Sequence, residues 1–177
     1  MRSIPKPTTE EYPPYSHIYM DLMADDGRVL EHLWNNFLTI KALVSELTDE
    51  QLLYRYAEGK WTIKEILVHL IDDERIYTYR ALRFARHDQT DLPGFDQDQY
   101  TAYSFANERS LESILDEYEA VRKATLLLYE YLPEEALTRG GTADGVENYR
   151  TVRALIYHLA GHERRHLNII KEKYLSN

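Results

Sequence analysis

Residues 62–86 read TIKEILVHLIDDERIYTYRALRFAR, and this stretch carries both the start signal and the periodicity of a long helix. Thr62 followed by Glu65 matches the capping-box pattern, in which each side chain bonds to the other residue's backbone N–H at a helix N-terminus. Apolar side chains then recur at the spacing of one helical face, namely at Ile63, Leu67, Leu70 and Tyr77. We therefore predict a helix that begins at Thr62 and ends near Arg86.

Three other long segments show the same helical spacing of apolar residues. The first covers about residues 17–47, and Gly27 is a candidate break near its start. Ser110 and Thr151 are cap residues of two later helices, which reach residue 132 and about residue 174. Four long helices without any sustained strand alternation predict an all-α protein, a four-helix bundle that forms one domain over residues 1–177.

The remaining segments are classified by their proline, glycine and capping residues. Residues 1–16 hold four of the six prolines and are predicted to be an extended leader, either lying along the bundle or forming a flexible tail. The connection 87–109 contains a turn at 92–95 and is predicted to be a packed crossover, with a mobile lid as the alternative. Residues 139–148 are glycine-rich and predict a surface loop. Short helical turns are expected at a second capping box, Thr48 with Gln51, and after Pro133.

Composition limits the classes of partner and of site. The chain has 177 residues, a formal net charge of -9 and no cysteine. An acidic surface disfavours nucleic acid and anionic membranes as partners, and the absence of thiolates leaves His, Asp and Glu as metal ligands. No apolar run has the length of a membrane span or the pattern of a signal peptide, so we expect a cytoplasmic protein. Fifteen tyrosines offer amphipathic surface for a homodimer.

The most informative chemical motif is a run of three histidines at four-residue spacing, His158, His162 and His166. Residues four apart are neighbours on one helix face, where two imidazoles can bind one metal ion. A helical wheel turns His162 and His166 towards the apolar side and leaves His158 as a flanking group. The alternative is that these are histidines at the edge of the core, satisfied by hydrogen bonds without a metal.

Two carboxylates are candidates for supporting roles at such a site. Glu163 falls on the apolar side of the same helix, where it could orient a ligand histidine or act as a base, or could reach solvent at the rim. Asp73 lies one turn beyond His69 and is a candidate base or a partner that orients His69. Periodicity alone places His69 on the shoulder of its helix, as a surface or interface residue.

Two segments resemble the DinB/YfiT-like family of metal-dependent proteins. In that pattern a tryptophan precedes a capped helix and a histidine follows eight residues later, as Trp61 and His69 do within residues 61–75. Residues 160–170, which contain His162 and His166, resemble the second half of the signature. The leader and residues 79–96 also resemble one branch of the family. Relatives often carry histidine where this chain has Arg165.

The resemblance implies a four-helix bundle and a divalent metal ion held by His69, His162 and His166. Three imidazoles leave positions open for water or substrate, and Zn²⁺ or Ni²⁺ is the expected ion. The resemblance further implies an enzyme acting on small molecules, with S-transfer of a low-molecular-weight thiol as one candidate activity. A metal-dependent hydrolase with Glu163 or Asp73 as its base is the second candidate. A non-catalytic metal- or ligand-binding bundle is the third.

Overall fold

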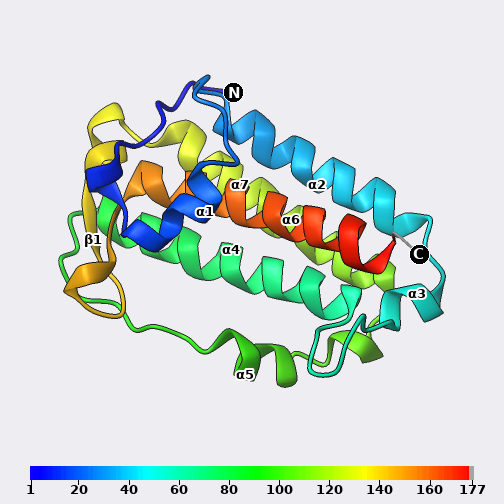
Figure 1. Cartoon of the computed structure of the whole chain (residues 1–177). Helices are drawn as coiled ribbons and strands as arrows, with labels where there is room; N and C mark the ends of the chain where they lie inside the picture. Colours follow the sequence, from blue (N-terminus) through cyan, green and yellow to red (C-terminus); the bar gives the residue numbers. More distant parts are fainter. Residues whose placement is uncertain (176–177) are drawn as a thin grey trace.

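Four long helices form the body of the protein in the computed structural model, which describes residues 1–175 (Figure 1). They are α2 (Val29–Ser45), α4 (Ile63–Ala85), α6 (Leu111–Tyr131) and α7 (Val152–Ile169), and a single π-helical segment, Ile170–Tyr174, continues α7. The four-helix bundle predicted from the sequence is confirmed. Among the described residues, no helix combines the length and apolar character that crossing a bilayer requires.

The predicted helix starts coincide with the observed caps. Glu65 N–H donates to Thr62 Oγ1 at 3.1 Å, and Thr62 N–H donates back to Glu65 Oε2 at 2.7 Å. The short helix α3 (Asp49–Leu53) begins with the same reciprocal pair, and Ser110 and Thr151 accept from backbone N–H groups at the starts of α6 and α7. Each cap satisfies N–H groups that have no partner within the helix, so the local sequence fixes where each helix begins.

The helical segment expected over residues 17–47 is interrupted around Gly27, the candidate break, and its main helix ends at Ser45. Helix α1 spans only His17–Met20, and the backbone is not helical again until α2. Gly27 adopts φ +71°, a conformation that favours glycine, and its carbonyl accepts a hydrogen bond from Ile4 N–H at 2.9 Å. The break therefore lets the chain turn and bind its own leader.

The leader lies along the bundle, as one of the two expectations had it (Figure 1). It is not extended throughout, because Thr9–Glu11 and Pro14–Ser16 form 3-10 turns. Ile4 is fully buried, and its carbonyl accepts a hydrogen bond from the Tyr157 hydroxyl on α7 at 2.8 Å. Gly161 on α7 allows close approach of α1, since a Cβ there would lie 2.2 Å from the Tyr19 carbonyl oxygen.

The two longer connections contain more regular structure than the sequence indicated. Residues 87–109 include α5 (Gln97–Ala102) and a 3-10 turn at Ala106–Glu108. The predicted surface loop contains β1 (Gly140–Thr142), which pairs antiparallel with β2 (Tyr149–Thr151), and a 3-10 turn at Val146–Asn148 lies between them. Three-residue strands are too short to show alternation, which is why the hairpin was not predicted. A further 3-10 turn, Glu134–Thr138, follows Pro133 as expected.

A buried guanidinium joins all four long helices. Arg122 of α6 is 2% exposed and donates to Glu74 of α4 at 2.9 and 3.0 Å and to Glu163 of α7 at 2.7 Å. It also donates to the Leu33 carbonyl on α2, while the Tyr118 hydroxyl donates to Glu163. Hydrogen bonds of charged groups are among the stronger ones in proteins, so this network fixes the helices relative to one another.

Candidate metal centre

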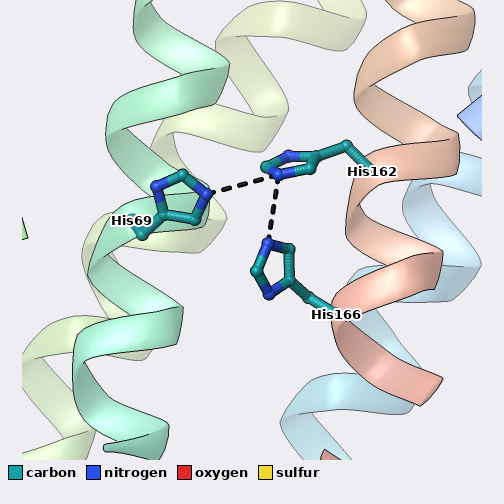
Figure 2. A group of neighbouring side chains, drawn as sticks. All are labelled: His69, His162 and His166. Atoms are coloured by element: carbon teal, nitrogen blue, oxygen red, sulfur yellow. Dashed lines mark hydrogen bonds between the residues drawn. The ribbon is translucent and has the colours of Figure 1, made fainter. Parts of the chain in front are cut away.

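Three histidines from two helices converge inside the bundle (Figure 2). His69 extends from α4, and His162 and His166 extend from successive turns of α7. His162 Nε2 lies 3.3 Å from His69 Nε2 and 3.1 Å from His166 Nε2. His69 and His162 are buried, and His166 is partly buried. The structure thus brings together the three residues that the family resemblance selected. They include His69, which helical periodicity alone had predicted to be a surface or interface residue.

The nitrogen positions fit a single bound ion. Two imidazole nitrogens that each lie about 2.0–2.1 Å from one tetrahedral ion are themselves about 3.3–3.4 Å apart. The two short separations around His162 are close to that value, and a ligand atom from each histidine lies within 4.8 Å of the others. Among the described residues, the group offers three nitrogen donors and no fourth protein ligand. This matches the open arrangement of catalytic metal sites, in which one position is left for water or substrate.

Burial keeps His69 and His166 in the protonation state that metal binding requires. Desolvation lowers the pKa of His69 to about 4, and burial also lowers the pKa of His166 well below its usual range. Both imidazoles are therefore neutral at pH 7 and have a lone pair to offer.

Asp73 selects the tautomer of the central histidine. Its Oδ2 lies 3.1 Å from His162 Nδ1 and makes no other polar contact among the described residues. Burial by itself would raise the pKa of Asp73, but His162 lowers it to about 2, so the carboxylate is ionised. A carboxylate beside Nδ1 holds the proton there and leaves Nε2 free for a metal ion. Sequence reasoning had paired Asp73 with His69, whereas the structure pairs it with His162.

Replacing Asp73 with asparagine is expected to weaken metal binding about 10- to 100-fold, the usual cost of losing the outer partner of a ligand histidine. Zinc affinity, measured by competition with a chromophoric chelator, provides the test. Asp72→Asn is the matched control, because Asp72 is the adjacent residue and lies outside the cluster. Equal affinities in the wild type and Asp73→Asn would show that Asp73 does not position His162.

The metal-free protein is expected to lose stability as the pH falls from about 7 towards 4. The pKa of His69 is lowered from 6.5 to about 4 on folding, so the unfolded chain binds the extra proton first, and the stability present above pH 6.5 is lost through that window. His69 alone would contribute on the order of 3 kcal/mol. Urea unfolding in chelator at pH 7.5 and pH 5 measures the effect. His69→Gln should flatten this dependence, whereas His17→Gln, at an exposed histidine, should not.

A cavity of about 200 Å³ adjoins the cluster, and His166 forms part of its wall. The Trp61 ring lies parallel to the His166 ring, at a centroid distance of 6.3 Å, and 4.7 Å from the His69 ring. Helix α5 contributes Asp98, so the 87–109 connection supplies part of this wall. The remaining lining residues come from the turn before α4, from α4 itself, and from α7 with its π-helical continuation: Tyr56, Gly59, Lys60, Ile66, Ile169 and Tyr174.

The other two candidates, His158 and Glu163, lie outside the three-histidine group. His158 is buried and stacks on Tyr77 of α4 at a centroid distance of 4.5 Å, and its Nδ1 has no hydrogen-bond partner among residues 1–175. Glu163 is buried in the Arg122 network described above, against Tyr118. Of the two candidate carboxylates, Asp73 therefore contacts the histidine cluster, while Glu163 is bound to α6.

One aromatic neighbour of the cluster was not anticipated. The Tyr19 ring of α1 packs edge-on against His162 at 5.3 Å and against His158 at 4.5 Å. No periodic signal marks it, because α1 is a single short turn whose position depends on the break before α2. Helix α1 thus helps to enclose the histidines on the α7 side.

Fold and site together define a helical bundle with an internal three-histidine cluster suited to a divalent metal ion. The model of the DinB superfamily matches residues 30–170, and the chain belongs to this superfamily. It is 31% identical over 129 residues to a protein of Oceanobacillus iheyensis named "Putative metal-dependent hydrolase OB0413", covering 72% of this chain and 73% of that protein.

A solved structure shows the same fold. YfiT from Bacillus subtilis, described as "a probable metal-dependent hydrolase with an unusual four-helix bundle topology", superposes with a TM-score of 0.74. The alignment covers 85% of this chain and 87% of that one, at 17% sequence identity. This likeness supports the assignment of the bundle architecture independently of the sequence match.

Proposed function

We propose that the protein is a divalent-metal-dependent hydrolase of a small substrate. The observation that carries the proposal is the convergence of three histidine Nε2 atoms beside a cavity, with no fourth protein ligand in the described group. The name of the relative from Oceanobacillus iheyensis supports the same class of reaction. Zinc or nickel is the proposed ion, because imidazole nitrogen suits both.

A divalent ion bound by these histidines would supply a Lewis acid that polarises a substrate carbonyl or phosphoryl oxygen and makes water a nucleophile near neutral pH. The chain's own residues prepare that chemistry. Asp73 holds the proton of His162 at Nδ1, and burial keeps His69 neutral. Trp61 covers two of the rings and limits the access of bulk water to them.

The cavity beside His166 is the proposed substrate site. Its volume of about 200 Å³ suits a small molecule or the reacting end of a longer one. Lys60 and Asp98 place one positive and one negative side chain on its wall, and aromatic residues provide apolar surface. Because Asp98 belongs to the 87–109 connection, substrate binding would involve this segment as well as the bundle.

The test is turnover of p-nitrophenyl acetate and p-nitrophenyl phosphate by protein that has been stripped with chelator and then reloaded with zinc or nickel. Hydrolysis is expected to require the metal, to need no added thiol, and to be lost in His69→Ala. Asp72→Asn should retain it. Metal loading without turnover of either ester in any of these samples would count against the hydrolase.

Thiol transfer, the other activity considered for this family, is separated in the same experiment. The chain has no cysteine, so a thiol nucleophile would have to be added as a cosubstrate. Turnover that occurs only after addition of a low-molecular-weight thiol would replace hydrolysis with transfer as the function of the site. Turnover unchanged by the thiol would support hydrolysis.

A further inference from the structure

Two buried arginines lie near each other at the end of the bundle where the β1–β2 hairpin lies. Arg80 of α4 is 5% exposed, and Arg150 of β2 is 2% exposed. Within residues 1–175, the polar contacts of both guanidinium groups are to neutral oxygens, and neither forms an ion pair. Arg122, the third buried arginine, instead has two carboxylate partners. Burial of an uncompensated positive charge is costly, so its presence at two neighbouring positions calls for a ligand.

The hydrogen-bonding capacity of the pair is largely unused. Arg80 donates from Nη2 to the Pro93 carbonyl at 2.9 Å. Arg150 donates to the Asn148 carbonyl at 3.3 Å and to the Tyr15 hydroxyl, while no described residue accepts a hydrogen bond from its buried Nε. Each guanidinium has five N–H donors, so several remain for a ligand. Burial lowers the pKa of Arg150 to about 10, which still leaves it charged at neutral pH.

Both arginines line one cavity of about 130 Å³, together with Tyr15, Tyr77, Phe95 and Asn148. A water molecule occupies about 30 Å³ of the liquid, so the cavity has room for a carboxylate or a phosphate group. The aromatic rings face the charged groups, with Arg80 Cζ 5.3 Å and Arg150 Cζ 5.7 Å from the Tyr77 ring centroid. The rings hold the guanidinium groups in place without neutralising them.

Part of the wall of this cavity is formed by two loops, the turn at 92–95 and the hairpin loop, which are joined by backbone hydrogen bonds. Leu92 and Ala143 form an isolated parallel bridge, in which Leu92 N–H donates to the Thr142 carbonyl at 3.1 Å and Asp144 N–H donates to the Leu92 carbonyl at 2.8 Å. The turn at 92–95 is therefore fixed against the hairpin loop. The exposed Asp144 also borders the cavity, but it makes no ion pair with either arginine.

We propose that the cavity between Arg80 and Arg150 is a binding site for a small oxyanion, a carboxylate or phosphate group. Paired guanidinium groups match the spacing of such oxygens and bind them through parallel N–H donors. The anion would supply the ion-pair partner that both arginines lack within residues 1–175, and it would accept hydrogen bonds from guanidinium N–H groups that face the cavity.

This anion site is separate from the metal centre. His69 and Arg80 are eleven residues apart on α4, a rise of about 16 Å along the helix axis. The stacked rings of Tyr77 and His158 lie between the two sites, since His158 neighbours His162 and Tyr77 faces both arginines. The proposal therefore does not depend on the proposed hydrolase activity.

The experiment is a titration of the full-length, chelator-treated protein with inorganic phosphate and, separately, with acetate, at constant ionic strength set with chloride. Binding is followed by isothermal calorimetry and by the melting temperature. Phosphate, acetate or both are expected to bind saturably with one site per chain. At about 100 times the dissociation constant, the melting temperature should rise by roughly 5–10 °C.

Arg80→Met and Arg150→Met should each abolish the anion-dependent rise, and Arg150→Lys should reduce the affinity at least about tenfold, because the planar donor pair is lost. Arg164→Met, at an exposed arginine of α7, is the charge-matched control and should respond like the wild type. His162→Ala should also keep the full response, which excludes binding of phosphate at the histidine cluster.

Saturable binding of phosphate alone, of acetate alone or of both would identify the class of oxyanion that the site accepts. No saturable response of the wild type to either anion would overturn the proposal. The proposal would also be overturned if Arg150→Lys bound the anion as tightly as the wild type and if a methionine variant that still unfolds cooperatively kept the full rise in melting temperature. Because the wild-type titration decides by itself, a methionine variant that fails to fold does not leave the question open.

Discussion

Replacement of Arg122 by methionine is expected to lower the free energy of unfolding by about 3–5 kcal/mol, the usual cost of removing one partner from a buried ion pair. The change leaves Glu74 and Glu163 buried without their shared cation, and it removes the donor to the Leu33 carbonyl. The carboxylates could escape part of this cost by taking up protons, and burial already raises the pKa of Glu163. Urea unfolding at pH 7.5 measures the loss.

A surface arginine provides the control for this prediction. Arg75 pairs with Glu117 but its side chain is 49% exposed, so Arg75→Met should change the unfolding free energy by no more than about 1 kcal/mol. Replacing Arg122, Glu74 and Glu163 together with apolar residues of similar volume should recover most of the loss, since no buried charge remains. A single Arg122→Met variant as stable as Arg75→Met would show that the network contributes little.

The sequence was sufficient to predict the helices whose ends are set locally. Thr62, Ser110 and Thr151 cap α4, α6 and α7 through contacts within the first turn, and such contacts need no tertiary information. The break before α2 was harder to predict. Met20, Met23 and Val29 are all buried, so the apolar pattern continues through non-helical backbone and suggested one longer helix.

Prediction from sequence periodicity failed for a similar reason at His69. Every residue from Ile63 to Ile71 is buried, because α4 packs against both α6 and α7. A helix covered on two sides has no single apolar arc, so the wheel had no reliable centre from which to judge His69. His162 and His166 could be placed from spacing alone because they share one helix. The pairing across helices came only from the resemblance of the Trp61 segment to a known family.

The burial of three arginines was not predicted at all. Arg80, Arg122 and Arg150 are residues that a sequence pattern assigns to solvent, since charged side chains are seldom fully buried. Their burial depends on partners distant in the chain: carboxylates of α4 and α7 for Arg122, and the walls of the oxyanion cavity for the other two. No local pattern contains that information.

Replacement of His162 by alanine is expected to remove the metal from the protein almost completely. Its Nε2 is the central one of the three, within 3.3 Å of both neighbours, and its Nδ1 is the atom that contacts Asp73. The loss of affinity should exceed the roughly 10- to 100-fold cost of losing an outer partner, because a direct ligand is gone. Elemental analysis of protein purified without a metal-binding tag should give about one ion per wild-type chain and less than about a tenth of that in the variant.

Comparison of His162→Ala with His69→Ala tests whether the ion joins two helices. His69 belongs to α4 and His162 to α7, so His69→Ala should lose the metal as His162→Ala does. Zinc at about 1,000 times its dissociation constant should stabilise the wild type by about 4 kcal/mol and should leave both alanine variants unchanged. His158→Gln is the matched control, because this histidine lies on the same helix but outside the group, and it should retain one ion. Retention of the metal by His69→Ala, with loss in His158→Gln, would instead place the ion on α7 alone and contradict the site derived above.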